Sequence, residues 1–147
     1  MVADAGNGNG RGHGFRELSG RHILVVEDCS STRGLIARLL SREGAHVSVC
    51  DNGKAAVNIV LDGRASDSPV EAVLMDMDMP VLDGHAATRL LRAKGFDRPI
   101  IALTAESTGP ERDTCIVEGC DDYITKPVET TILIRVILGC LSRAATK

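Results

Sequence analysis

Short apolar runs alternate with amphipathic stretches along the chain from residue 21 onward. The apolar runs are rich in Val and Ile or alternate with polar residues, which predicts strands at 22–27, 46–50, 71–76, 98–104 and 121–125. Apolar residues at helical spacing follow each run and predict helices at 30–44, 53–63, 84–95, 110–119 and 128–142. Five strand–helix units in a row predict an α/β doubly wound fold, with a parallel sheet covered by helices on both faces.

The first and last helices carry more specific expectations. Ser30 or Ser31 is expected to cap the start of the first helix and Gly44 to end it. The side chains expected on its apolar face are Leu35, Ile36, Leu39 and Leu40. In the last helix, the apolar arc is about twice the ~100° stripe that core packing needs. This width predicts exposed aliphatic surface and hence an interaction site.

The first twenty residues have a different composition from the rest of the 147-residue chain. Residues 1–20 hold six glycines, five of them in "GNGNGRGHG" and the sixth at Gly20, and this composition cannot bury a core. We therefore expect a flexible tail or linker at 1–20 and one folded domain at 21–145. The glycines match neither GxxxxGK[ST] nor GxGxxG, so they do not indicate a nucleotide-binding loop.

Composition excludes several classes of partner. Aromatic residues make up 2%, there is no Trp, and the net charge is −3, which argues against nucleic-acid binding by this chain. Five cysteines without a CxxC pair are typical of reduced thiols in a cytoplasmic protein. No signal peptide and no apolar run near the ~18 residues of a membrane span is present, so no membrane association is expected.

Polar residues follow the predicted strands at the points where ligands bind in parallel sheets, which is outside the carboxyl ends. They are Glu27, Asp28, Asp76, Thr104 and Lys126. Three neighbouring carboxylates repel one another unless a hard cation such as Mg²⁺, or Mn²⁺ in its place, lies between them. A carboxylate nucleophile with a metal ion, a lysine and a threonine hydroxyl indicates phosphoryl transfer to an aspartate.

The stretch "VLMDMDMPVLDG" (73–84) allows two assignments, because Asp76 and Asp78 lie two residues apart. It resembles the first motif of haloacid-dehalogenase-type phosphatases, in which the first Asp is the nucleophile and the second a general acid/base. That motif normally lies on the first strand, whereas here two strand–helix units precede it. The phosphatase alternative also leaves Glu27 and Asp28 without a role, and the chain is short for that fold.

Four blocks in order resemble the receiver domain of two-component response regulators, and most closely the receivers of hybrid histidine kinases. They are "ILVVED", "VLMDMDMPVLDGHAATRLLR", "PIIALTA" and "GCDDYITKPV", and the resemblance covers about residues 21–143. It implies a flavodoxin-like three-layer sandwich, (βα)5, with strand order 2-1-3-4-5. It further implies a phosphorelay domain that accepts a phosphoryl group from a histidine kinase or a histidine phosphotransfer domain and is not a multi-turnover enzyme.

The resemblance also assigns roles to single residues. Asp76 matches the phospho-accepting aspartate, which also binds the metal ion together with Glu27, Asp28 and the backbone carbonyl of Asp78. Thr104 and Lys126 match the residues that bind the phosphoryl group, and Tyr123 matches the aromatic residue that turns inward when Thr104 moves. The resemblance also implies a cis peptide bond between Lys126 and Pro127.

Two hypotheses concern regulation. The side chains of Asp78 and Glu106 flank the expected phosphoryl position, where hydrolytic water must approach, so they are expected to tune the lifetime of the phosphorylated state. The last helix is expected to make a homodimer or to contact a neighbouring domain through its apolar surface.

Overall fold

The computed structural model describes residues 16–79, 82–105 and 109–145, without the side chains of residues 109–112. Its five strands form one parallel sheet in the order β3-β2-β4-β5-β6. The strands are β2 (His22–Val26), β3 (His46–Cys50), β4 (Ala72–Asp76), β5 (Ile100–Thr104) and β6 (Asp122–Thr125). Counted along the chain, the order is second, first, third, fourth, fifth, so the predicted fold class and strand order are confirmed.

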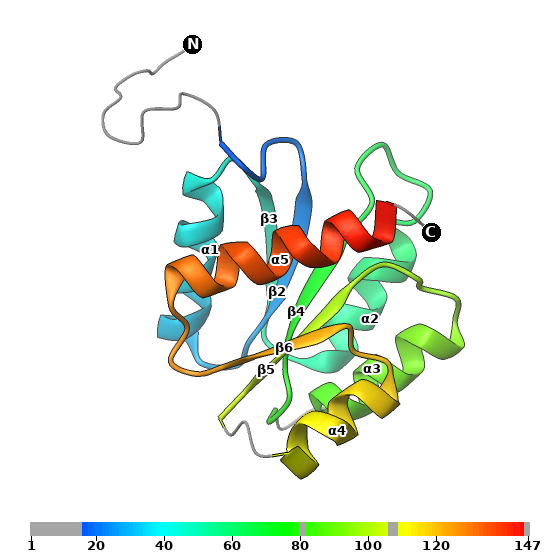
Figure 1. The fold of residues 1–147 in the computed structure, drawn as a ribbon. Coiled ribbons are helices and arrows are strands. Elements are labelled where there is room, and N and C mark those ends of the chain that lie inside the picture. Colours follow the sequence, from blue (N-terminus) through cyan, green and yellow to red (C-terminus); the bar gives the residue numbers. More distant parts are fainter. Residues whose placement is uncertain (1–15, 80–81, 106–108, 146–147) are drawn as a thin grey trace.

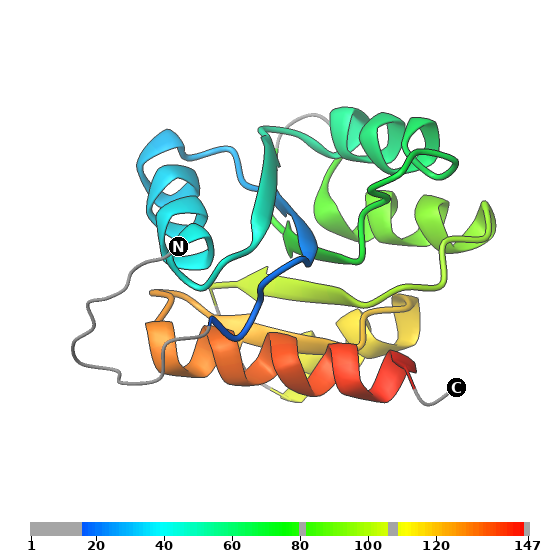
Figure 2. The same cartoon turned by 90° about the horizontal axis from the view of Figure 1, so that it is seen from above.

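Five helices cover the sheet on both sides. They are α1 (Ser30–Arg42), α2 (Gly53–Asp62), α3 (Gly84–Ala93), α4 (Gly109–Glu118) and α5 (Thr130–Ala145). Helices α1 and α5 lie on one face, and α2, α3 and α4 lie on the other (Figures 1 and 2). Each face of the sheet therefore has its own apolar core, and β2, β4 and β5 are buried along their whole length.

Helices α2 and α3 begin at side chains that cap them, whereas α1 does not. Asn52 caps α2 by accepting a hydrogen bond from the Ala55 N–H at 2.8 Å, and Asp83 caps α3 in the same way. The predicted cap of α1 by Ser30 or Ser31 is wrong. Both serines lie inside the first turn, and the extended residue before the helix is Cys29, which makes no side-chain cap hydrogen bond.

The apolar side chains of α1 and α5 differ in exposure from the predictions. Leu35 is 43% exposed, because the core contact of α1 is limited to Ile36 and Leu40 with Leu39 at its edge. The wide apolar arc of α5 is largely covered, since most of its aliphatic side chains are buried or packed against the core. Ile132 is the large apolar side chain that stays exposed among the described residues of this helix.

The packed part of the chain includes residues that precede β2. Leu18 is fully buried with the α1 and α5 core, and its N–H donates to the carbonyl of Glu43 at 2.8 Å. Gly44, which follows α1, leaves room for Ser19 and Arg16, because a Cβ there would lie 2.6 Å from the Ser19 hydroxyl. The segment from Arg16 onward therefore packs on the turn between α1 and β3.

A single arginine joins α3, α4 and β5 at the end of the sheet away from the strand carboxyl ends. All five N–H groups of Arg92 donate hydrogen bonds. Four go to the carbonyls of Phe96, Arg98 and Gly119, the last accepting two, and the fifth goes to the Asp121 carboxylate at 2.8 Å. The guanidinium group thus connects the backbone segments that follow α3 and α4, because it donates to carbonyls in both.

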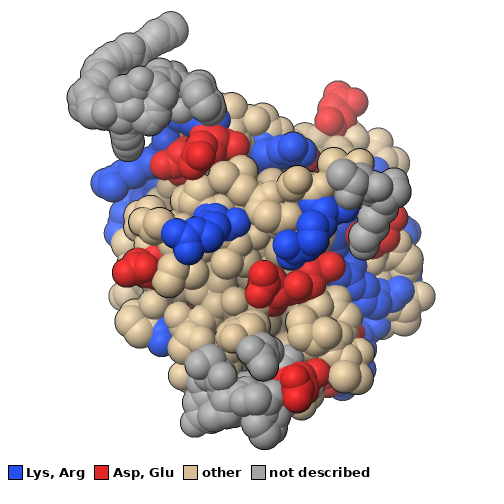
Figure 3. All heavy atoms as spheres, in the orientation of Figure 1, with Lys and Arg blue, Asp and Glu red and all other residues tan. Residues whose placement is uncertain are grey.

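The described helices and the charges on the face in Figure 3 can be compared with what membrane crossing and nucleic-acid binding require. Within the described ranges, no helix combines the length and the apolar character that crossing a bilayer requires. On the face that α5 covers, basic side chains lie among acidic ones, and the described residues there form no continuous basic stripe (Figure 3).

Candidate functional site

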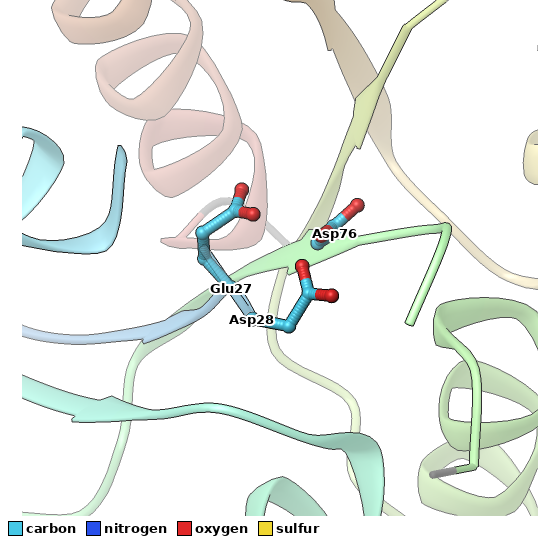
Figure 4. A group of neighbouring side chains, drawn as sticks. All are labelled: Glu27, Asp28 and Asp76. Atoms are coloured by element: carbon cyan, nitrogen blue, oxygen red, sulfur yellow. The ribbon is translucent and has the colours of Figure 1, made fainter. Parts of the chain in front are cut away.

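Three carboxylates converge at the carboxyl edge of the sheet. Glu27 and Asp28 directly follow β2, and Asp76 is the last residue of the neighbouring strand β4 (Figure 4). One oxygen from each carboxylate lies within 4.8 Å of the other two. Parallel pairing of β2 with β4 brings together residues that are about fifty positions apart in sequence, as the strand-end argument predicted.

Two of these carboxylates are buried and share one cation. Glu27 and Asp76 are each 1% exposed, whereas Asp28 is exposed to solvent. The Lys126 ammonium group, which follows β6, lies 3.0 Å from Glu27 Oε1 and 3.2 Å from Asp76 Oδ1. One ammonium group cannot balance three carboxylates, so the site keeps an excess of negative charge.

Backbone N–H groups orient both buried carboxylates. The N–H of Cys29 donates to Glu27 Oε2 at 3.2 Å, and the N–H of Asp78 donates to Asp76 Oδ1 at 3.0 Å. The second oxygen of Asp76, Oδ2, is buried and accepts no hydrogen bond from the described residues. A buried carboxylate oxygen without a partner is costly, and it is available to a metal ion or an electrophile.

Burial and the neighbouring charges change the proton affinity of two groups in the site. Burial, reinforced by the neighbouring Glu27, raises the pKa of Asp76 from 3.8 to about 7, against the opposing effects of the Asp78 N–H and Lys126. Burial lowers the pKa of Lys126, but Glu27 and Asp76 outweigh it, so that this pKa lies above its usual value. A bound divalent cation would relieve the repulsion that disfavours ionised Asp76.

The chemistry of this donor set fits Mg²⁺ or Mn²⁺. Glu27, Asp28 and Asp76 supply hard oxygen ligands, and Asp28 is open to solvent, which suits a metal ion that keeps several waters. Oδ2 of Asp76 is buried without a hydrogen-bond partner among the described residues. A bound cation or a transferred phosphoryl group would supply that partner.

The other predicted site residues lie on the neighbouring strands. Thr104 ends β5 and is 3% exposed, and its carbonyl accepts from the Lys126 N–H at 2.8 Å. Tyr123 in β6 is half-buried and packs against the apolar core under α2, α3 and α4. The peptide bond between Lys126 and Pro127 is cis. Glu106, predicted to flank the phosphoryl group, lies outside the described residues.

Asp78 differs from Asp76 in its surroundings. Its side chain is exposed, whereas its N–H faces the Asp76 carboxylate. The backbone of Asp78 is therefore part of the site and its carboxylate lies at the solvent boundary.

The structure adds contacts that the sequence did not indicate. Arg33 Nη1 donates to the carbonyl of Glu27 at 2.9 Å and thereby fixes the turn that carries the acidic pair. Gly53 and Gly84 bring the starts of α2 and α3 against the backbone that follows Asp76. The close approach at Gly53 has no local sequence signal, since the partner backbone, at Leu82, is twenty-nine residues away.

The fold and the site define an α/β doubly wound protein with an acidic, lysine-paired site at the carboxyl edge of its sheet, and comparison with known proteins gives the family. The sequence model described as the response regulator receiver domain matches residues 23–138. The chain therefore belongs to the response regulator receiver domain family.

Relatives and solved structures agree with this assignment. The chain is 33% identical over 138 residues to hybrid signal transduction histidine kinase I of Dictyostelium discoideum, covering 88% of this chain and 8% of the kinase. It resembles the receiver domain of sensor histidine kinase PA1611 from Pseudomonas aeruginosa PAO1, solved with a magnesium ion coordinated in the active site cleft. That likeness has a TM-score of 0.73 and 36% identity and covers 84% of this chain and 99% of the other.

A third likeness is to a receiver domain in a complex. The complex joins the receiver domain of Saccharomyces cerevisiae Ssk1 to the histidine phosphotransfer protein Ypd1. The likeness has a TM-score of 0.77 and 27% identity, and it covers 88% of this chain and 94% of the other. The chain spans 8% to 17% of the length of the first curated relatives that it matches.

Proposed function

We propose that this receiver domain accepts a phosphoryl group on Asp76 in a Mg²⁺-dependent step and changes conformation as a result. The observation that carries the proposal is the environment of Asp76. Its carboxylate is buried between Lys126 and the acidic pair, with one oxygen unpartnered among the described residues. A structural carboxylate in this position would be expected to have both oxygens satisfied.

The chemistry follows from the atoms present. An oxygen of Asp76 attacks the phosphorus atom of a phosphohistidine, a P–O bond forms, and the P–N bond to the donor histidine breaks. Lys126 lies where its ammonium group can pair with a phosphoryl oxygen, and the Thr104 hydroxyl is assigned the neighbouring oxygen. These groups compensate the negative charge that arrives with the phosphoryl group.

The metal ion would be held by Glu27, Asp28, Asp76 and the backbone carbonyl of Asp78. When bound, Mg²⁺ supplies positive charge to the carboxylates and to the phosphoryl oxygens. Mn²⁺ has the same preference for oxygen ligands and is expected to replace it.

The response to phosphorylation is assigned to Thr104 and Tyr123. When the Thr104 hydroxyl moves toward the phosphoryl group, it leaves space behind it. The half-buried side chain of Tyr123 is expected to turn inward and fill that space. The two residues lie on adjacent paired strands, since Ala102 opposes Tyr123 in the β5–β6 register.

The expected phosphoryl donor is a histidine kinase or a histidine phosphotransfer domain. Several relatives are histidine kinases, others are response regulators, and the similar Ssk1 receiver is seen with a histidine phosphotransfer protein. Contact with a neighbouring domain, or a homodimer through α5, stays a prediction, with Ile132 as the exposed apolar side chain that favours it. A cytoplasmic location is expected from the five free cysteines.

Incubation with acetyl phosphate and Mg²⁺ tests the proposal. The intact mass of the wild type should rise by one phosphoryl group, and Asp76→Asn should not change, because the amide is not a nucleophile. EDTA should prevent the change in the wild type. A mass increase in Asp76→Asn would contradict Asp76 as the acceptor. Steady turnover of several phosphoesters without a stable adduct would instead support the phosphatase alternative with Asp76 and Asp78.

We also propose that the Asp78 carboxylate sets the lifetime of the phosphorylated state, because it is exposed at the mouth of the site. Asp78→Asn removes its charge while keeping its size and the N–H that binds Asp76. We expect the hydrolysis rate of the Asp76 phosphate to change by about tenfold, measured as loss of the phosphorylated mass after acetyl phosphate is removed. Equal rates in the variant and the wild type would contradict the role.

A further inference from the structure

Two glycines let helix starts touch the backbone that surrounds Asp76. A Cβ on Gly84, the first residue of α3, would lie 2.2 Å from the carbonyl oxygen of Asp76 and 2.7 Å from the Cα of Met77. A Cβ on Gly53, the first residue of α2, would lie 2.1 Å from the carbonyl oxygen of Leu82. Neither distance is compatible with any larger side chain unless backbone moves.

The residue that Gly53 touches has an unusual backbone conformation. Leu82 has φ of +55°, a left-handed conformation that is strained for an L-residue and favours glycine. Its side chain is half-buried and packs against the core under α2, α3 and α4. The core contact on one side and Gly53 on the other therefore hold Leu82 in place, and Asp83 then caps α3.

The contact at Gly53 also reaches the acidic pair. The N–H of Glu27 donates to the carbonyl of Cys50 at 3.1 Å, at the end of β3. Two residues later, Asn52 caps α2 and fixes the position of Gly53. The turn from β3 to α2 thus links the backbone of Glu27 to the backbone of Leu82 through consecutive short contacts.

We propose that Gly53 and Gly84 are positioning residues of the phosphoryl-acceptor site. By permitting these contacts, they fix the backbone after Asp76 relative to Glu27 and Asp28, so that the Asp78 N–H meets Asp76 and the Asp78 carbonyl is available to the metal ion. This inference rests on the proposed function, since it concerns the geometry of the proposed metal site.

Gly53→Ala tests the proposal, because its methyl group must displace the backbone at Leu82. We expect the Kd for Mg²⁺, measured by isothermal titration calorimetry, to rise about tenfold, as for other changes just outside a metal's ligands. Phosphorylation by acetyl phosphate should slow at low Mg²⁺ and recover in part at saturating Mg²⁺. A purely structural role would lower stability without moving the Mg²⁺ dependence.

Gly34→Ala is the matched control. Gly34 lies in α1, where a Cβ would meet only the end of the Arg38 side chain at 3.6 Å. The alanine adds the same methyl group and favours the helix, so the Kd for Mg²⁺ should equal that of the wild type.

Leu82→Gly keeps the test decisive if Gly53→Ala does not fold. Glycine accepts the left-handed conformation, but it loses the side chain that anchors the backbone, so Mg²⁺ should bind about threefold more weakly. Unchanged Mg²⁺ affinity in Leu82→Gly and in folded Gly53→Ala would overturn the positioning role. If the wild type itself neither binds Mg²⁺ nor becomes phosphorylated, the proposed function fails instead.

Discussion

Lys126→Met is expected to slow phosphorylation of Asp76 by roughly a hundredfold, the loss that follows removal of one donor from a site of developing negative charge. The Lys126 ammonium group lies 3.2 Å from Asp76 Oδ1 and 3.0 Å from Glu27 Oε1. Methionine keeps most of the length and apolar volume of the side chain and removes its charge. The buried carboxylates then lose their nearest cation, and the incoming phosphoryl group meets uncompensated repulsion.

The measurement is the initial rate of mass increase with acetyl phosphate at saturating Mg²⁺. Lys54→Met is the control, because Lys54 is exposed in the first turn of α2 and its replacement changes the net charge by the same amount. Circular dichroism establishes that both variants are folded. If Lys126→Met and Lys54→Met were phosphorylated at the same rate, the assignment of Lys126 would be wrong.

Asp76→Asn is expected to stabilise the metal-free protein at alkaline pH. The pKa of Asp76 is about 7 in the folded chain against 3.8 for an ordinary aspartate, chiefly because of burial. Between these values the folded chain retains a proton that the unfolded chain has released. The stability contributed by this group is therefore fully present below about pH 4 and is lost as the pH rises through 7.

Asparagine carries no titratable proton, so the advantage of Asp76→Asn over the wild type should grow between pH 5 and pH 8. One pKa unit corresponds to about 1.4 kcal/mol, and sharing of Lys126 reduces the effect, so we expect an increase of about 1–2 kcal/mol. Urea unfolding in EDTA measures it at both pH values. Asp67→Asn, at an exposed loop position, should show no such trend. An advantage that is equal at both pH values would contradict the pKa of Asp76.

The sequence predicted the fold well because its signals are local. Strands β2, β4 and β5 are buried on both faces, and such strands appear in a sequence as continuous apolar runs. Once a parallel sheet is inferred, the polar residues that follow those runs must share one edge. That reasoning brought Asp76 together with Glu27 and Asp28 without any structural information.

What the sequence did not predict depends on contacts between distant segments. The approach of Gly53 to Leu82 brings together two turns that are twenty-nine positions apart in sequence, and nothing local at Gly53 indicates it. The burial of Leu18 in a segment that composition assigns to a tail depends on the packing of α1 and α5. The exposure of Leu35 and the coverage of α5 likewise follow from which neighbours each helix meets, which periodicity cannot give.

The acceptor site exists only when strands from both halves of the chain are paired. Glu27 and Lys126 are ninety-nine positions apart, and both reach Asp76 only through the β2–β4 and β4–β5–β6 pairings. An unfolded or half-folded chain has none of this constellation, so it offers its donor an ordinary solvated aspartate. Under the proposed function, phosphorylation is therefore expected only of molecules in which these strand pairings have formed.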